Sequence, residues 1–137
     1  MRHFYIFNIS NEFMELTKNN PYQLFKTFEE LYHIPQNEKI YGINIYDNMT
    51  TLLHKENINN DLYNDYYDSY FYSKFKNIHL YNDYFNKENT KLTIKNSYML
   101  LDTTAIKPKF FEYLHKYNSL FACDFENKDY FWLESIA

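Results

Sequence analysis

The sequence contains one glycine, Gly42, and three prolines among its 137 residues. Loops that hold nucleotide phosphates, such as G-x-G-x-x-G and the P-loop, need several glycines, and so does the G-x-S-x-G turn of many hydrolases. None of these motifs can be formed here. The scarcity of glycine therefore excludes most nucleotide-binding loops and many hydrolases.

Cysteine is equally scarce, because Cys123 is the only one. No intramolecular disulfide and no cysteine-based zinc site can be assembled, and a reducing cytoplasm is the natural setting. Cys123 falls within an apolar run between Ala122 and Asp124. A nucleophilic thiol needs exposure and a neighbouring base, so we interpret Cys123 as a small buried hydrophobe.

Long apolar runs are also missing, and the N-terminus has no apolar segment of the kind found in signal peptides. The net charge is −4, which argues against a mainly electrostatic nucleic-acid binder. We therefore expect a cytoplasmic protein that binds neither membranes nor nucleic acid directly.

Aromatic residues are abundant at 22%, with 16 tyrosines and 13 phenylalanines. One interpretation is an aromatic recognition surface. The other is a genome whose codon usage favours Asn, Tyr, Lys, Ile and Phe, and the accompanying abundance of asparagine favours this second interpretation. Aromatic content alone therefore indicates little about function.

The C-terminal stretch has the best-defined pattern in the chain. Phe110, Leu114 and Tyr117 recur at helical spacing. A nearly continuous apolar run then predicts a strand covered on both faces, and a polar turn separates it from a second aromatic strand. The two strands are expected at Leu120–Phe125 and Tyr130–Leu133.

The N-terminal stretch predicts a strand followed by two helices. Arg2–Ile9 is apolar on both sides, as in an interior strand. Ser10 is a candidate cap for a helix over Asn11–Lys18. Asn20 and the proline after it begin a second helix, Pro21–His33.

The middle of the chain is less regular. Tyr41, Ile43 and Ile45 alternate like a short strand, and Asp47 is a candidate start for a helix over Met49–Leu53. Further predictions are an aromatic helix, an irregular segment and a hairpin of two strands, at Asp61–Lys76, Ile78–Asn89, and Thr90–Lys95 with Tyr98–Leu101. Together these elements predict a single α+β domain over residues 1–137, with a mainly antiparallel or mixed sheet of about five strands covered by helices.

One group of three aspartates and the single residue Asp124 are candidate functional carboxylates. Asp61, Asp65 and Asp68 would share one face of the aromatic helix and have the chemistry to hold a hard cation in a metal-dependent enzyme. A solvated acidic face explains them better, because like charges at this spacing repel. Asp124 interrupts an apolar strand, and we expect it to be held by hydrogen bonds to a neighbouring loop.

Three stretches of the sequence share a pattern with a known family: the opening RHFYIFNISNEFMEL, the Leu/Phe-rich helix with Leu24, Phe25, Phe28 and Tyr32, and FFEYLHKYNSLFACDFENKDYFWL near the end. Taken in order, they resemble the family of sporulation inhibitors of replication, SirA. The last is similar to a family ending with FFE, then a strand of the form FLA-DF, then Y-G-W-L. This resemblance covers about half of the chain well and is weakest over residues 36–89.

The resemblance implies a protein-binding inhibitor rather than an enzyme. Members of the family bind the N-terminal domain of the replication initiator DnaA and hold back new rounds of replication as spores form. It implies no catalytic residue, cofactor or metal, and a monomer before the complex forms. Contacts are implied through the helix after the first strand, with Phe13 the leading candidate among Phe13, Met14, Thr17, Lys18 and Tyr41.

One departure leaves an alternative open. Thr17 stands where family members tend to carry an aromatic residue. A diverged member of the family with a different protein partner is therefore the second hypothesis.

Overall fold

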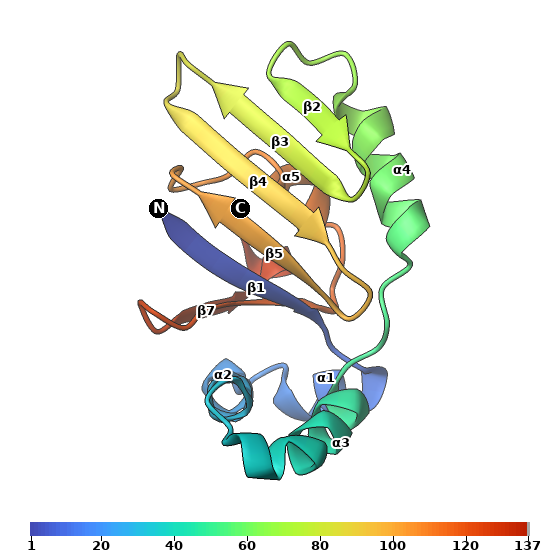
Figure 1. Cartoon of the computed structure of the whole chain (residues 1–137), viewed down its shortest axis with the longest axis vertical. Helices are drawn as coiled ribbons and strands as arrows, with labels where there is room; N and C mark the ends of the chain where they lie inside the picture. The colour runs from blue at the N-terminus through green and yellow to red at the C-terminus, as the bar shows by residue number, and fades with distance from the viewer. Residues whose placement is uncertain (137) are drawn as a thin grey trace.

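Strand β1 (Arg2–Asn8) lies in the middle of the sheet, hydrogen bonded to a neighbour on each side. Phe4 and Ile6 point into one hydrophobic cluster, while Phe7 and Ile9 point into another on the opposite face. The prediction of an interior strand at the N-terminus is thus confirmed. Figure 1 shows the protein as a computed structural model, which describes residues 1–136.

The sheet has seven strands in the order β2-β3-β4-β5-β1-β6-β7, and every neighbouring pair is antiparallel. All five predicted strands are present, and the sheet has two more. The remaining strands are β2 (Tyr72–Phe75), β3 (Ile78–Asp83), β4 (Glu88–Ile94), β5 (Tyr98–Thr103), β6 (Leu120–Asp124) and β7 (Asp129–Trp132).

Helices cover both faces of this sheet (Figure 1), so the α+β class is confirmed. One group packs with β1, β6 and β7, and the other packs over the opposite face. Within residues 1–136 no helix has both the length and the apolar character needed to cross a bilayer. The first group is α1 (Asn11–Thr17), α2 (Pro21–Tyr32) and α3 (Lys39–Met49), and the second is α4 (Lys55–Tyr66) and α5 (Phe111–Leu114).

The start of α2 agrees with the sequence, whereas the start of α1 differs in detail. The Asn20 side chain accepts a hydrogen bond from the Gln23 backbone N–H at 3.3 Å, as expected of an N-cap. Ser10 occupies the N-cap position of α1, but its side chain does not cap the helix. Its hydroxyl donates instead to the Asn48 carbonyl at 3.2 Å.

The expected strand around Tyr41 to Ile45 was wrong, because these residues lie in α3. The inward side of α3 carries Gly42, Tyr46 and Met49 at i, i+4 and i+7. The alternating Tyr41, Ile43 and Ile45 lie outside that stripe and are exposed. The helix predicted over Met49–Leu53 was also wrong, because α3 ends at Met49 and an extended connection follows.

The edge of the sheet formed by β2 and β3 was missed for a different reason. The aromatic helix ends at Tyr66 rather than Lys76, and β2 follows it. The segment expected to be irregular contains β3, whose residues alternate between half-buried and buried. Its buried residues include His79 and Asp83, so the inward side of the strand is partly polar and hydrophobic alternation does not reveal it.

Near the C-terminus, the pattern that predicted a longer helix gives only the single turn α5. Phe110 and Leu114 are fully buried, as their helical spacing suggested. Cys123 is fully buried as well, and burial raises the pKa of its thiol. It therefore behaves as the small hydrophobe expected from its position.

Asp124 is held as predicted, by the turn that follows its strand. Its carboxylate accepts from the Asn127 backbone N–H and side-chain amide at 3.2 and 2.8 Å, and from Arg2 Nε at 3.0 Å. Burial works to raise the pKa of Asp124, but these donors outweigh it and the pKa is lowered. The pair with Arg2 also ties the start of β1 to the end of β6.

Candidate protein-binding face

Helix α1 presents little of its inner side to solvent. Phe13 and Met14 are half-buried against the aromatic cluster beneath the helix. Thr17 is buried, and its hydroxyl donates to the Phe13 carbonyl at 2.5 Å. The outer side carries Leu16, of which 78% is exposed. Of the apolar residues of this helix, Leu16 is therefore the one most open to a partner.

The side chain of Lys18, just after α1, binds other groups of the same chain. Its ammonium donates to the Asn118 carbonyl at 2.8 Å and forms an ion pair with Glu134. It also lies 4.2 Å from the centre of the Trp132 ring, a cation–π geometry. These contacts fix the end of α1 to the C-terminal part of the chain.

Helix α3 has an unusually apolar outer side. Ile40 and Tyr41 are 78% and 76% exposed, and Ile43 and Ile45 are also exposed. Isolated apolar residues are common on protein surfaces, but a contiguous exposed group marks an interaction site or a binding groove. Tyr41, the fifth residue implied by the resemblance, belongs to this group.

Gly42 lies where α3 packs against the end of α2 and the segment that follows it. A Cβ atom at this position would lie 2.9 Å from the end of the Ile34 side chain and 3.5 Å from Leu31. A larger residue would therefore require the tip of the Ile34 side chain to shift. A shallow groove of about 350 Å³ follows this junction, lined by Leu31, Ile34 and Ile43 among others.

The groove is closed on one side by a hydrogen bond from α3 to the sheet. The Tyr46 hydroxyl donates to the Ser97 carbonyl in the β4–β5 turn at 2.6 Å. Burial raises the pKa of Tyr46 to about 12, so the hydroxyl stays protonated and remains a donor at neutral pH. This bond holds the inner side of α3 in place and leaves its outer side free.

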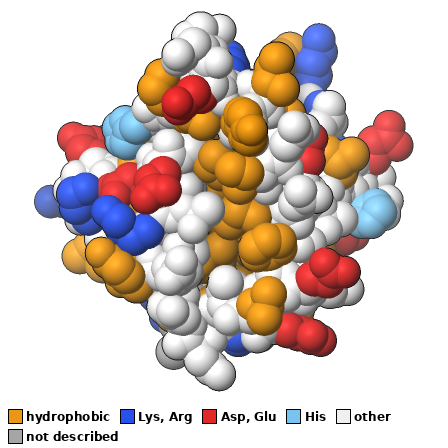
Figure 2. Space-filling view, turned by 90° about the horizontal axis from the view of Figure 1, so that it is seen from below, with side chains coloured by type: hydrophobic (Ala, Val, Ile, Leu, Met, Phe, Trp, Pro, Cys, Tyr) orange, Lys and Arg blue, Asp and Glu red, His pale blue; other side chains and the backbone are white. Residues whose placement is uncertain are grey.

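The start of α1 and the end of α3 meet at one point. The Ser10 backbone N–H donates to the Met49 carbonyl at 2.8 Å, and Ile9 forms a bridge with Thr50. The two helices therefore belong to one rigid surface. Figure 2, seen from below Figure 1, shows hydrophobic side chains gathered in a strip across this end of the molecule, with acidic and basic groups toward the sides.

We call the exposed apolar residues of α1 and α3 the apolar face, and define it as Leu16, Ile40, Tyr41, Ile43 and Ile45. Sequence reasoning included only Tyr41 of this set among the candidate contacts. Ile40, Ile43 and Ile45 were missed because α3 was not recognised as a helix, whereas Leu16 lies on the predicted helix α1 but was not named as a contact. Ile40, Ile43 and Ile45 fall outside the stripe through Gly42 and Met49, which is the signal that helical periodicity would have given.

The aspartates considered as a metal site do not form one. Helix α4 ends at Tyr66, so Asp68 lies beyond the helix that carries Asp61 and Asp65. Asp65 pairs with Lys116 at 3.6 Å, and Asp61 accepts a hydrogen bond from Tyr113. Among the residues that the structure describes, no group of three or more His, Cys, Asp or Glu side chains is placed to hold a metal ion.

Comparison with family models identifies the family of this chain. Residues 2–137 match the model of the sporulation inhibitor of replication protein SirA, which is nearly the whole chain. The chain belongs to the SirA family. A search of curated proteins gave no match. SirA proteins are regulatory inhibitors of replication linked to sporulation, rather than a known family of enzymes.

Membership extends the resemblance beyond the three stretches that first indicated it. The match includes residues 36–89, where the sequence by itself was hardest to interpret. That region supplies α3, and with it most of the apolar face. The SirA assignment and the exposed surface therefore concern the same part of the chain.

Proposed function

We propose that this SirA protein inhibits replication initiation by binding the N-terminal domain of the initiator DnaA through the apolar face. Two findings support the proposal. The family is one of replication inhibitors linked to sporulation, and α3 exposes four large apolar side chains at the end where it meets α1. The apolar face carries the proposal, because its exposure in a free protein needs a reason.

Binding of this kind needs no catalytic group. Large side chains such as Tyr41 and Ile40 lose exposed apolar surface when a partner covers them, and a few such residues provide most of the binding energy at an interface. The partner is blocked for as long as the complex lasts. We therefore expect inhibition to be stoichiometric, with one copy of each protein in the complex.

The five residues implied by the resemblance have different roles in this proposal. Tyr41 makes direct contact, and Phe13 and Met14 contribute their exposed edges. Thr17 and Lys18 act indirectly, because Thr17 is buried and Lys18 is bound to Glu134 and Asn118. They position α1 so that Leu16 faces the partner.

Calorimetry with the purified N-terminal domain of DnaA tests the proposal. We expect a measurable heat of binding at tens of micromolar protein, and Leu16→Ser should weaken the complex by about fivefold or more, the effect of losing about 1 kcal/mol. Phe13→Ala should weaken it too, but also lower stability, because Phe13 packs on the aromatic cluster. Leu16→Ser is therefore the cleaner variant.

A matched control is Ile106→Ser. Ile106 is 96% exposed and belongs to the loop between β5 and α5. Figure 1 shows this loop away from α1 and α3. The Ile106→Ser variant loses an apolar side chain similar to that of Leu16, so its affinity for the DnaA domain should equal that of the unchanged protein. Equal losses in both variants would place the contact surface elsewhere.

The alternative is a SirA protein that has changed partner. Thr17, where the family tends to have an aromatic residue, favours it because the inner side of α1 then differs from that of relatives. An absence of heat with the DnaA domain, together with capture of another protein that depends on Leu16 and Tyr41, would support this alternative over the first proposal.

A further inference from the structure

A second cavity lies on the face of the sheet that α4 and α5 cover. It has a volume of about 330 Å³ and opens between α4 and the segment that runs from α5 to β6. At the roughly 30 Å³ that a water molecule occupies in the liquid, it has room for about ten waters. Its size falls within the range of pockets that bind small molecules, whose volumes begin near 300 Å³.

The floor of this cavity is apolar and fixed. Met99 and Leu114 are fully buried, and Leu120, the first residue of β6, is also buried. Met99 is on β5 and Leu114 is on α5, so the floor joins the sheet to the helix. A ligand with an apolar body would cover surface that is already preorganised by the core.

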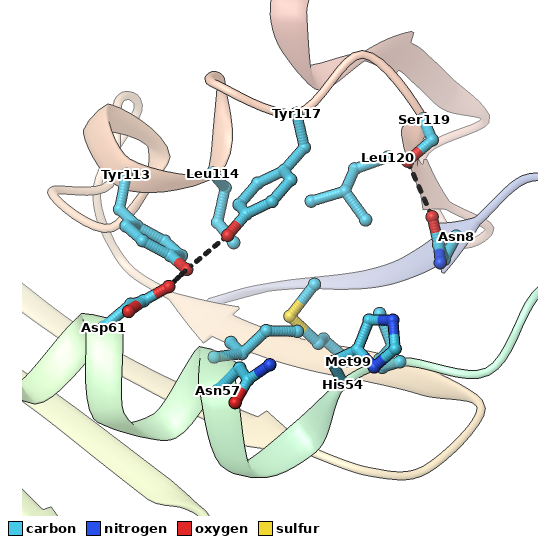
Figure 3. Close-up of a pocket in the computed structure, with 12 residues that line it drawn as sticks. Asn8, His54, Asn57, Asp61, Met99, Tyr113, Leu114, Tyr117, Ser119 and Leu120 are labelled. Atoms are coloured by element: carbon cyan, nitrogen blue, oxygen red, sulfur yellow. Dashed lines mark hydrogen bonds between the residues drawn. The ribbon is translucent and has the colours of Figure 1, made fainter.

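One end of the cavity is rich in hydrogen-bond acceptors. The Tyr113 hydroxyl donates to Asp61 Oδ2 at 3.2 Å, and its oxygen lies 2.6 Å from the Tyr117 hydroxyl. Because the one hydroxyl proton of Tyr113 goes to Asp61, Tyr117 must donate to Tyr113. The lone pairs of Tyr117 and the second oxygen of Asp61 are left without a donor from the described residues. Figure 3 shows these three groups together at one end.

The opposite end is polar, and His54 and Asn57 also line the cavity. Ser119 donates to the Asn8 side-chain oxygen at 2.7 Å, which leaves the Asn8 amide hydrogens available (Figure 3). Among the described residues that line the cavity, Asp61 is the one carboxylate, and neither lysine nor arginine is present. Lys116, the nearby cation, pairs with Asp65 instead. The cavity therefore favours cations and disfavours anions.

We propose that this cavity binds a small amphiphilic amine. The apolar body of the ligand lies on Met99, Leu114 and Leu120, and its ammonium group donates to Asp61 and to the Tyr117 oxygen. A carboxylate at the same position meets the Asp61 charge and two acceptors without a donor, so acids of the same shape are excluded. This site is separate from the apolar face and does not depend on the proposed partner.

Three probes of nearly the same shape test the site: 2-phenylethylamine, 2-phenylethanol and phenylacetate. Binding is followed by amide chemical shifts of the labelled protein in low-salt buffer. We expect the amine to bind with a dissociation constant below about 1 mM. We expect the alcohol to bind at least about threefold more weakly, since a partly exposed ion pair contributes up to about 1 kcal/mol. Phenylacetate should cause no shift in the cavity.

Asp61→Asn should remove the preference for the amine over the alcohol while leaving the alcohol bound. The matched control is Asp68→Asn, an exposed aspartate beyond the end of α4, which loses the same charge outside the cavity and should keep the preference. Tyr117→Phe, which removes one acceptor and no charge, should weaken the amine less than Asp61→Asn does.

Several results would overturn the proposal. The amine causing no shift at about 5 mM, well above the expected dissociation constant, would do so. So would shifts confined to the apolar face, phenylacetate binding as tightly as the amine, or Asp61→Asn and Asp68→Asn behaving alike.

Discussion

The two helical layers cover the same sheet but differ in what they bury and in what they expose. Beneath α2 and α3, aromatic rings pack on the sheet, and Phe7 stacks on Phe28 with centroids 4.1 Å apart. Beneath α4, buried polar groups such as His79 are hydrogen bonded. Outside, α3 presents isoleucines whereas α4 presents mostly polar residues. Both interiors contain buried aromatic rings, so the clearer difference between the two layers lies in their outer sides.

The difference between the outer sides of the two layers indicates which layer binds a partner in addition to stabilising the sheet. Both layers have fully buried anchors, Phe28 on α2 and Leu62 on α4. Only the layer with α1 and α3 combines its anchor with exposed large aliphatic groups along a helix. We infer that both layers stabilise the sheet and that one of them also binds a partner.

The largest expected effect on stability comes from truncating Phe28, the buried ring that anchors the layer of α1, α2 and α3. Phe28→Ala deletes a ring that is 1% exposed and stacked on Phe7. The free energy of unfolding should fall by about 3–5 kcal/mol, as for other buried phenylalanines. Urea unfolding measures the loss, and native-state amide exchange shows where it acts, with α1, α2 and α3 expected to exchange faster.

The matched variant on the other side is Leu62→Ala, with an expected loss of about 2–5 kcal/mol. Here the faster exchange should be centred on α4. The same exchange pattern in both variants would mean that the two layers open as one cooperative unit, and the distinction between them would not hold for stability.

A smaller effect should appear in the pH dependence of stability. His79 is fully buried, with Nε2 2.7 Å from Asn59 Oδ1 and Nδ1 2.8 Å from the Tyr72 hydroxyl. Burial, and secondarily the charge of Lys74, lowers the pKa of His79 to about 4. An unfolded histidine has a pKa of about 6.5, so the unfolded state binds the proton more readily. Stability should therefore fall as the pH drops from about 6.5 to 4, by at most about 1.4 kcal/mol per pH unit.

The control for this effect is His79→Gln, which cannot titrate. Urea unfolding at a series of pH values should give a flatter profile in that window, whatever its absolute stability. Glu29 titrates lower, because hydrogen bonds from Lys128 and Lys26 reduce its pKa to about 2, and its contribution is lost below about pH 4.5. An unchanged slope between pH 6.5 and 4 in His79→Gln would contradict the assignment to His79.

The smallest effect on stability, and the sharpest test of the two exteriors, comes from exposed tyrosines. Tyr41→Ala on α3 and Tyr63→Ala on α4 each remove an exposed ring, and each should change the free energy of unfolding by about 0.5 kcal/mol or less. Only Tyr41→Ala should weaken binding to the DnaA domain, measured by calorimetry. A loss of affinity in Tyr63→Ala of the same size would remove the functional contrast between the layers.

Sequence patterns predicted the elements in which local periodicity and burial agree. Helix α2 turns its apolar residues inward, and the interior strands β1 and β6 are apolar on both faces, as their sequences indicated. The hydrogen bonds of Asn20 and Asp124 also followed from the sequence, because both use chemistry within a few residues.

The wrong predictions concern elements in which hydrophobic periodicity and burial do not agree. In α3 the exposed side is apolar and the inward side includes Gly42, so the pattern of a buried helix is reversed. In β3 the inward side includes His79, which is hydrogen bonded to Asn59, a residue distant in the sequence. Such bonds form only once the chain has folded, so no local pattern reveals them. The apolar face was missed partly for the first reason, and β3 partly for the second.

The single buried cysteine also makes the protein a reporter of its own motions. Cys123 lies in β6 between Tyr5 of β1 and Tyr130 of β7, on the side covered by α2. A thiol reagent reaches it only when that layer lifts or the sheet comes apart. The rate of labelling under native conditions therefore measures how often the layer that bears the apolar face opens. A rate faster than that of global unfolding would show that this layer can separate from the sheet on its own.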